Sequence, residues 1–182
     1  MRIISGKFKS RRINAPAKLP LRPTTDFAKE GLFNILNNRI NYTDVTILDL
    51  FAGTGSISYE FLSRGCKEAT TVELNPKCIE FMHKTKQLLN LDNFIIIKGD
   101  VFSYLNHCLT NFDIIFADPP FELEELNKFP DLIFENKLLK PGGWLIIEHS
   151  SRNNFSEYPL FIDHRNYGRV NFSFFREKEL LG

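Results

Sequence analysis

The stretch ILDLFAGTG at residues 47–55 decides the fold of this 182-residue chain. It joins an apolar run, predicted as a buried strand over residues 45–50, to a predicted helix from Ser56 to about Arg64. An open α/β sheet binds its ligand at such a loop, because the carboxyl end of a strand and the N-terminus of a helix meet there. Ser58 stands where a G-x-G-x-x-G pattern has its third glycine, so the loop alone does not identify the ligand.

Downstream of this loop, strands and helices continue to alternate. A helix is predicted from Pro76 to about Leu89, with proline in its first turn. Further apolar strands are predicted at residues 69–73, 94–98, 112–117 and 144–148, the last of them entered through a turn at 141–143. Near-continuous apolar strands separated by helices indicate a mostly parallel sheet covered on both faces.

Both ends of the chain are predicted to form hairpins. Residues 160–164 and 170–176, joined around Tyr167-Gly168-Arg169, would give the sheet an antiparallel edge. Residues 1–13 are predicted as a short β-hairpin that turns at Ser5-Gly6-Lys7. We expect this basic arm to span residues 1–22 and the main domain to span residues 23–182.

A helix is predicted at the start of the main domain, with Asp26 as its cap and its end near Asn38. The apolar residues of this segment recur at helical spacing and are expected to face the core: Ala28, Leu32, Leu36 and Ile40, with Phe27 and Ile35 widening the stripe.

Three acidic residues lie at or just after the ends of three successive predicted strands: Asp49, Glu73 and Asp100. A carboxylate at position 49 would repel the pyrophosphate of a dinucleotide, whereas it would attract the sulfonium and ammonium groups of S-adenosylmethionine. Glu73 is placed to accept hydrogen bonds from both ribose hydroxyls, and Asp100 from the adenine amine. The three acids therefore favour S-adenosylmethionine as the cofactor.

The tetrapeptide Asp118-Pro119-Pro120-Phe121 follows the fourth strand and is the predicted catalytic segment. Its two prolines make it stiff and remove N–H donors. The Asp118 carboxylate and the Pro119 carbonyl would accept from both hydrogens of an aromatic amine and aim its lone pair at a methyl carbon. Phe121 would stack on a base turned out of its helix or loop. The motif predicts methylation of an exocyclic base amine, whether guanine N2 or adenine N6.

Positive charge is concentrated at the N-terminus. Seven of the 23 basic residues precede the first acid, Asp26, and the remaining 16 stand against 22 acidic residues. Such polarity suggests a basic arm directed at a polyanion and attached to an acidic body.

Composition excludes several other classes of protein. With 43% hydrophobic and 25% charged residues, the chain has the composition of a globular domain. No apolar run has the length of a membrane span, and the first residues lack the apolar core of a secretory signal. Three scattered cysteines suggest neither disulfides nor a metal site. We expect a cytoplasmic monomer that binds neither metal nor membrane.

Together these motifs resemble a known family. The segments FAGTG at 51–55, DPPF at 118–121 and RPTTD at 22–26 are similar to those of the bacterial RsmD family, as are the opening residues 2–6. The family's members methylate guanine N2 in small-subunit (16S) ribosomal RNA, usually at guanine 966. The resemblance implies a class I methyltransferase fold of seven strands, Rossmann-like, with an RNA-contacting N-terminal hairpin.

The resemblance also implies a cofactor-side role for the segment around Thr25. The expected cofactor-binding residues are Thr25, Asp49, Phe51, Gly53, Gly55, Glu73, Leu74, Asp100 and Val101. The expected RNA-binding residues are Arg2, Lys7, Lys9, Arg11, Arg12, Arg22 and Arg169. For Arg22, contact with the cofactor's carboxylate remains an equal alternative. The expected partner is ribosomal RNA or a small ribosomal subunit, either an assembly intermediate or mature.

Three other functions are compatible with parts of the sequence. A DNA adenine-N6 methyltransferase would use the same tetrapeptide, but it usually needs an added recognition region for which 182 residues leave little room. A non-catalytic RNA-binding or ribosome-assembly factor is disfavoured by the intact acids and tetrapeptide. A nicotinamide-dependent oxidoreductase is disfavoured by Asp49 and by the missing third glycine.

Overall fold

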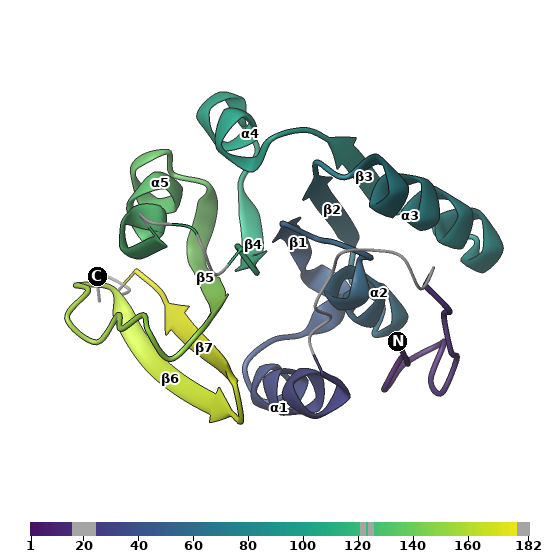
Figure 1. Ribbon diagram of the computed structural model, residues 1–182, viewed down its shortest axis with the longest axis horizontal. Coiled ribbons are helices and arrows are strands. Elements are labelled where there is room, and N and C mark those ends of the chain that lie inside the picture. Colours follow the sequence, from purple (N-terminus) through teal and green to yellow (C-terminus); the bar gives the residue numbers. More distant parts are fainter. Residues whose placement is uncertain (16–24, 121–122, 124–125, 178–182) are drawn as a thin grey trace.

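Figure 1 shows the computed structural model of the chain, which describes residues 1–15, 25–120, 123 and 126–177. The strands are β1 (Thr46–Leu50), β2 (Glu68–Glu73), β3 (Phe94–Lys98), β4 (Phe112–Ala117), β5 (Leu139–His149), β6 (Phe161–Tyr167) and β7 (Val170–Phe175). The helices are α1 (Asp26–Leu36), α2 (Ser56–Ser63), α3 (Pro76–Leu89), α4 (Val101–His107) and α5 (Phe129–Glu135), with short 3-10 turns η1 (Tyr42–Asp44) and η2 (Leu126–Lys128).

The seven strands form one sheet in the order β3-β2-β1-β4-β5-β7-β6. Strands β1 to β5 are parallel to their neighbours, whereas β7 runs antiparallel to β5, and β6 antiparallel to β7. The predicted sheet, mostly parallel with an antiparallel edge, is therefore confirmed. The strand order reverses between β1 and β4, and an open sheet leaves a crevice for ligands at such a reversal.

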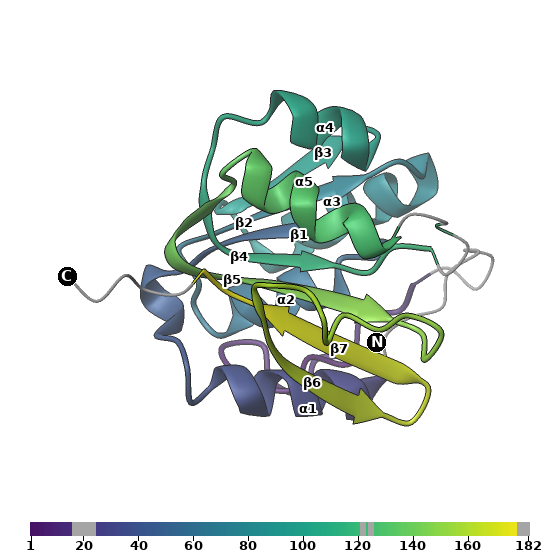
Figure 2. The same cartoon turned by 90° about the vertical axis from the view of Figure 1, so that its left-hand side faces the viewer.

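The sheet separates two apolar cores, and strand residues alternate between them. On β4, Ile114 and Phe116 face the core shared with α1, α2 and α3, while Ile115 and Ala117 face the core shared with α4 and α5. Figure 2 shows α1 on one side of the sheet and α4 and α5 on the other. Apolar residues on both faces explain why these strands have nearly continuous apolar sequences.

Several predicted boundaries agree with the structure, and one strand is longer than expected. Helix Pro76–Leu89 and strands Phe94–Lys98 and Phe112–Ala117 end where the sequence predicts. The predicted turn at 141–143 is wrong, because these residues lie inside β5. There the register with β4 shifts, and Gly142 takes a φ of 73° that its lack of a Cβ permits.

Helix α1 begins one residue earlier than its predicted cap suggests. The N-cap is Thr25, not Asp26, because the Thr25 hydroxyl accepts a hydrogen bond from the Ala28 N–H at 3.1 Å. The predicted core face is confirmed for Ala28, Leu32 and Leu36, which are buried. It is wrong for Phe27, whose side chain is 67% exposed.

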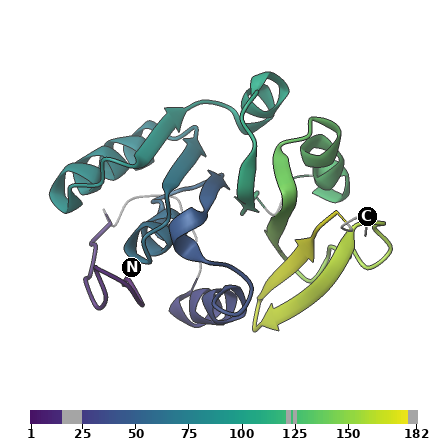
Figure 3. The same ribbon diagram turned by 180° about the vertical axis from the view of Figure 1, so that it is seen from behind.

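The predicted N-terminal β-hairpin is confirmed in its pairing, although the paired segments are short. In residues 1–15, Met1 and Ile13 exchange backbone hydrogen bonds at 3.1 and 3.0 Å, and the Ile3 N–H donates to the Arg11 carbonyl at 3.0 Å, on either side of an antiparallel bridge at Arg2. The amides of Ile4 and Ser5 donate to the Glu60 carboxylate of α2, at 2.9 and 3.0 Å. The segment is thus a short hairpin packed on α2 (Figure 3). The predicted domain boundary at 22/23 lies outside the described residues.

Candidate active site

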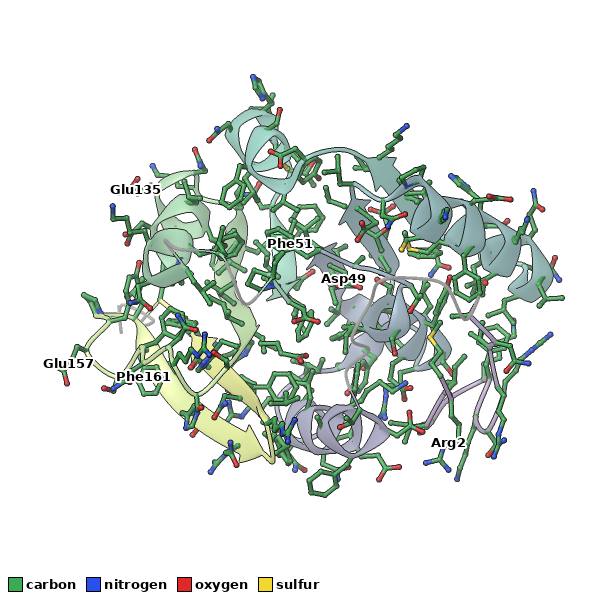
Figure 4. All side chains as sticks on the ribbon, in the orientation of Figure 1. Arg2, Asp49, Phe51, Glu135, Glu157 and Phe161 are labelled. Carbon is green, nitrogen blue, oxygen red and sulfur yellow. The ribbon has the colours of Figure 1, made fainter. Side chains whose placement is uncertain are left out.

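A cavity of about 1090 Å³ opens at the carboxyl ends of β1, β2 and β4. Figure 4 shows Asp49 and Phe51 near the centre of the molecule, at this edge of the sheet. The predicted cofactor and catalytic residues that line it are Thr25, Asp49, Phe51, Gly53, Glu73, Leu74, Asp100, Val101, Asp118, Pro119 and Pro120, and the predicted RNA contact Arg169 joins them. The structure thus brings together residues from five strand ends and the start of α1.

The loop after β1 adopts an unusual backbone that shapes one wall of this cavity. Phe51, Gly53 and Gly55 have φ angles of 59°, 54° and 79°. Gly55 caps α2 and is not among the cavity-lining residues; a Cβ there would lie 3.1 Å from the Met82 sulfur. The Phe51 ring packs against those of Phe102 and Phe129, at 6.2 and 6.0 Å between centroids.

Asp49 is buried at the cavity wall, with 2% of its surface exposed. Its Oδ2 accepts hydrogen bonds from the Ser58 hydroxyl at 2.7 Å and from the Ser58 N–H at 3.2 Å. Burial raises the pKa of Asp49 to about 7, although the two bonds from Ser58 oppose this rise. Among the described residues, the hydrogen-bond donors to this carboxylate are thus neutral groups.

Glu73 joins the loops that follow β1 and β2. Its Oε2 accepts from the Gly53 N–H at 2.7 Å, and its Oε1 accepts from the N–H groups of Leu74 and Asn75 at 2.9 and 2.7 Å. These three amides fix the carboxylate at the cavity wall. A carboxylate offers about four acceptor positions, so capacity remains for a hydroxyl donor.

Asp100 both caps helix α4 and lines the cavity. Its Oδ1 accepts from the Ser103 N–H at 2.9 Å and so caps α4. The same residue lines the cavity. The cap accounts for one oxygen of the carboxylate, and the predicted contact with an adenine amine stays a prediction.

The segment at 118–120 forms another wall of the cavity. The Asp118 N–H donates to the Leu50 carbonyl at 3.3 Å and thereby ties the segment to the end of β1. The Leu123 N–H donates to the Pro120 carbonyl at 3.0 Å. Pro119 is buried and Pro120 exposed. Phe121, the predicted stacking residue, lies outside the described residues.

The basic residues of the arm fall into two groups. Arg2 pairs with Asp26 at 3.5 Å and Glu30 at 3.0 Å, so acids of α1 already offset its charge. Four others project from the arm into solvent: Lys7, Lys9, Arg11 and Arg12. Arg22 lies outside the described residues. Contact of this arm with RNA stays a prediction.

Sequence reasoning missed the buried charges that hold the arm. Lys29 and Glu60 are 1% and 0% exposed, with Lys29 Nζ 3.9 Å from Glu60 Oε2. Lys29 Nζ also donates to the Arg2 carbonyl at 2.6 Å and to the Ser56 hydroxyl at 3.3 Å. Arg64 pairs with Glu60 Oε1 at 3.0 Å. The paired residues Lys29 and Glu60 are far apart in the sequence, and no sequence motif predicts that they meet.

Further cavity-lining residues were not predicted as functional. They are Phe27, Ala52, Thr54, Ser56, Ile57, Gly99, Phe102, Phe116, Leu123, Glu148, Tyr167, Gly168 and Val170. Most are neighbours of predicted residues, but Phe27 and Tyr167 come from α1 and β6. The sequence analysis placed Tyr167 in a predicted hairpin turn and Phe27 in the apolar period of a helix, and neither pattern signalled a functional role.

Neither a metal cluster nor a membrane helix is found in the part of the chain that the structure describes. No three His, Cys, Asp or Glu side chains there are grouped so as to hold a metal ion. None of the described helices is long and apolar enough to cross a membrane.

Comparison with known proteins identifies close relatives. Residues 1–176 match a family model described as Conserved hypothetical protein 95. Ribosomal RNA small subunit methyltransferase D of Escherichia coli K12 is 32% identical over 178 residues, covering 98% of this chain and 84% of the relative. The protein of that name from Buchnera aphidicola subsp. Baizongia pistaciae is 35% identical over 155 residues, covering 85% and 78%.

Solved structures agree with the sequence relatives. The Escherichia coli protein yhhF superposes with a TM-score of 0.85 at 30% identity, over 97% of this chain and 98% of that one. An RNA methyltransferase from Salinibacter ruber, solved in complex with S-adenosylhomocysteine, has a TM-score of 0.67 at 15% identity, over 88% and 97%. The second likeness is one of fold.

Proposed function

The chain belongs to the RsmD family of methyltransferases, and from this premise we propose that it methylates the exocyclic N2 amine of a guanine in small-subunit ribosomal RNA. Membership of the family carries the coarser statement, that the protein is an S-adenosylmethionine-dependent methyltransferase of ribosomal RNA. Methylation of a base amine is supported by one observation, that Asp118 and Pro119 line the same cavity as Asp49 and Glu73. The choice of guanine N2 over adenine N6 rests on the resemblance to the family.

The cavity fits S-adenosylmethionine, which supplies an electrophilic methyl group on a sulfonium. Burial destabilises the charged form of Asp49 and raises its pKa, so binding of a cationic ligand beside this carboxylate would be favourable. Glu73 is fixed by three amides and would hold ribose hydroxyls. The Gly53 backbone at a φ of 54° leaves the wall free of a side chain. These residues would bind the cofactor, with Thr25, Phe51, Leu74, Asp100 and Val101 around it.

The chemistry of the chain's own residues is positioning and charge stabilisation. The Asp118 carboxylate and the Pro119 carbonyl would accept from the two hydrogens of the amine and orient its lone pair. Because Asp118 is tied to the end of β1, its position relative to Asp49 is set by two adjacent parallel strands. Asp118 would also accept the proton that the methylated amine releases.

The basic arm supports an RNA substrate. Lys7, Lys9, Arg11 and Arg12 are exposed on a segment that Glu60 holds against α2. Neutralising these four residues should weaken RNA binding and flatten its dependence on salt, because each phosphate contact releases counterions. If the RNA affinity of this variant and its dependence on salt are both unchanged, the arm is not part of the RNA interface.

The decisive experiment is methyl transfer from labelled cofactor to small-subunit particles that lack the modification, followed by nucleoside mass spectrometry. We expect N2-methylguanosine, and the modified nucleotide is then mapped against guanine 966. Asp118→Ala should lose turnover by 100-fold or more, on the order of the effect of removing a positioned acceptor, while it still binds the cofactor. Asp92→Ala is the matched control, since Asp92 is an exposed acid before β3, at the opposite edge of the sheet. N6-methyladenine as product, or full activity of Asp118→Ala, would overturn the proposal.

A further inference from the structure

Phe27 occupies a place on α1 that the packing of the helix does not explain. The buried face of α1 consists of Ala28, Lys29, Leu32, Phe33 and Leu36. Phe27 lies off this face, with 67% of its side chain exposed, so it adds little to the apolar core. A single exposed aromatic residue is ordinary in itself. Its location decides whether it has a role.

Phe27 lies at the wall of the active-site cavity, against Tyr167 at the end of β6. The two rings meet edge to face, with 5.6 Å between centroids and 79° between planes. Tyr167 is also in contact with Phe172 of β7, at 5.9 Å between centroids. Figure 1 shows α1 and the β6–β7 hairpin side by side, and Figure 3 shows the same from behind.

The close approach of Tyr167 to α1 depends on Gly31. A Cβ at position 31 would lie 2.1 Å from Tyr167 Cε1 and 2.2 Å from its Cζ. Helix interiors disfavour glycine by about 1 kcal/mol relative to alanine, so Gly31 is costly to α1 taken alone. The glycine gives Tyr167 the room to support Phe27.

The aromatic pair separates the active-site cavity from a second hollow of about 370 Å³ along α1. The exposed amide side chains of Asn34 and Asn38 line this hollow. Glu30 also lines it, but Arg2 pairs with that carboxylate at 3.0 Å. On the other side of the pair, the exposed Arg169 lines the active-site cavity.

An aromatic face with amides on one side and a guanidinium on the other suits a single-stranded nucleic acid. Unpaired bases stack on aromatic side chains, their edges accept and donate to amides, and arginine binds the phosphates between them. Such a surface continues directly from the cavity that takes the reacting base. Because the RNA chain is continuous, the nucleotides next to that base must lie beside the cavity, and the exposed Phe27 ring at its wall is placed to meet one of them.

We propose that Phe27, supported by Tyr167, is the stacking platform for an unpaired base next to the methylated nucleotide. The inference rests on the proposed function, since it takes RNA as the substrate. It assigns Phe27 to substrate binding and not to the cofactor. Asn34 and Asn38 then face the edge of the stacked base, and Arg169 faces its phosphate.

The test compares three variants in RNA binding, cofactor binding and methyl transfer. Phe27→Ala should weaken RNA binding about 5- to 150-fold, the range for loss of one stacked base, and leave the cofactor Kd unchanged. Phe27→Tyr keeps a stacking face and should restore affinity to near the original value. Leu88→Ala is the matched control, because Leu88 is an apolar residue of α3 that is 64% exposed and lines neither hollow.

Each outcome has a definite meaning. Unchanged RNA affinity in Phe27→Ala, or an equal loss in Leu88→Ala, would overturn the platform. A weakened cofactor Kd in Phe27→Ala would assign the ring to the cofactor and also overturn it. If the unaltered protein methylates ribosomal RNA at guanine N2 while Phe27→Ala behaves identically, the platform fails and the proposed function stands. If the unaltered protein neither binds nor methylates RNA, both fail together.

Discussion

Glu60 of α2 and Asp49 of β1 are both buried, yet the surroundings of their carboxylates differ. Glu60 lies between the cations Lys29 and Arg64 and also accepts from the amides of Ile4 and Ser5. Asp49 receives neutral donors, the hydroxyl and N–H of Ser58, within the part of the chain that the structure describes. One acid has its charge balanced inside the protein, and the other faces a cavity with a pKa raised to about 7 by burial.

This difference separates a structural charge from a ligand-binding charge. A buried ion that is paired and hydrogen-bonded is stable as it stands, and removing one partner leaves the other uncompensated. A buried carboxylate with neutral donors alone is destabilised in its charged form, so a cationic ligand gains more from it. We expect substitutions at the two acids to have opposite consequences for folding and for cofactor binding.

The largest effect is expected for Glu60→Gln. The substitution leaves Lys29 buried without its carboxylate, and burial already lowers the pKa of that amine. The free energy of unfolding should fall by about 3–5 kcal/mol, as for other broken buried ion pairs. Urea denaturation of the purified protein measures it.

The control for this prediction removes both charges. Lys29→Met combined with Glu60→Gln should recover part of the lost stability, because no unpaired ion remains. The cofactor Kd of either folded variant should stay within about threefold, since neither residue lines the cavity. A loss below 1 kcal/mol in Glu60→Gln would mean that the pair is not a structural charge.

Asp49→Asn should show the reverse pattern. The asparagine still accepts from Ser58, but it no longer attracts a sulfonium or ammonium, so cofactor affinity should fall about 10- to 100-fold. Stability at pH 8 should hold or rise, because a buried carboxylate with a raised pKa costs stability when it is charged. Calorimetric titration and urea denaturation give the two values. If the cofactor affinity of Asp49→Asn is unchanged, Asp49 is not a ligand-binding charge and does not differ from Glu60 in this respect.

Some of this contrast was visible in the sequence. Asp49, Glu73 and Asp118 were predicted to meet because parallel strands bring their carboxyl ends to one edge, and the cavity contains all three. The sheet, its antiparallel edge and most strand limits follow from apolar periodicity, which reports burial directly.

Other features depend on contacts that sequence spacing does not encode. The pairing of Lys29 with Glu60 arises only once α1 packs beside α2. The alternation of residues predicts the hairpin of the arm, but it does not predict that the Glu60 carboxylate accepts from the amides of Ile4 and Ser5 and so holds the arm on α2. Phe27 fitted the apolar period of α1, and only the packed structure reveals that it faces outward.

A pH titration sharpens the comparison further. The pKa of Asp49 in the folded protein, about 7, exceeds its ordinary value, so its contribution to stability is present below about pH 4 and lost as pH rises through 7. A cationic cofactor prefers the charged form, so its affinity should rise over the same interval. Asp49→Asn should abolish both trends.

Ser58→Ala should shift the pH dependence of cofactor affinity without abolishing it. Loss of the hydroxyl donor, which lies 2.7 Å from Asp49 Oδ2, should raise the pKa of Asp49 further. The midpoint of the affinity profile should therefore move upward by about one pH unit. Kd values measured between pH 5.5 and 9 decide this. A midpoint that does not move would mean that another group governs the profile.

The smallest effect is expected at a third acid, Asp113, whose partner Lys140 binds it at 2.7 Å near the surface. The two side chains are 31% and 38% exposed, so water screens the pair. Burial tends to raise the pKa of Asp113, but hydrogen bonds from Lys140 and Thr46 outweigh it and lower the pKa. The stability that this gives is present above the ordinary pKa of an aspartate and lost as pH falls through the lowered value.

Lys140→Met should therefore cost only about 0.2–1 kcal/mol at pH 7, and less at high salt. The cost should shrink as pH falls through the lowered pKa of Asp113 and vanish once Asp113 is protonated in both proteins. Urea denaturation at two salt concentrations and two pH values measures it. A cost as large as that of Glu60→Gln would mean that exposure does not govern the value of these pairs. The contrast between Glu60 and Asp49 would then rest on geometry alone and not on burial.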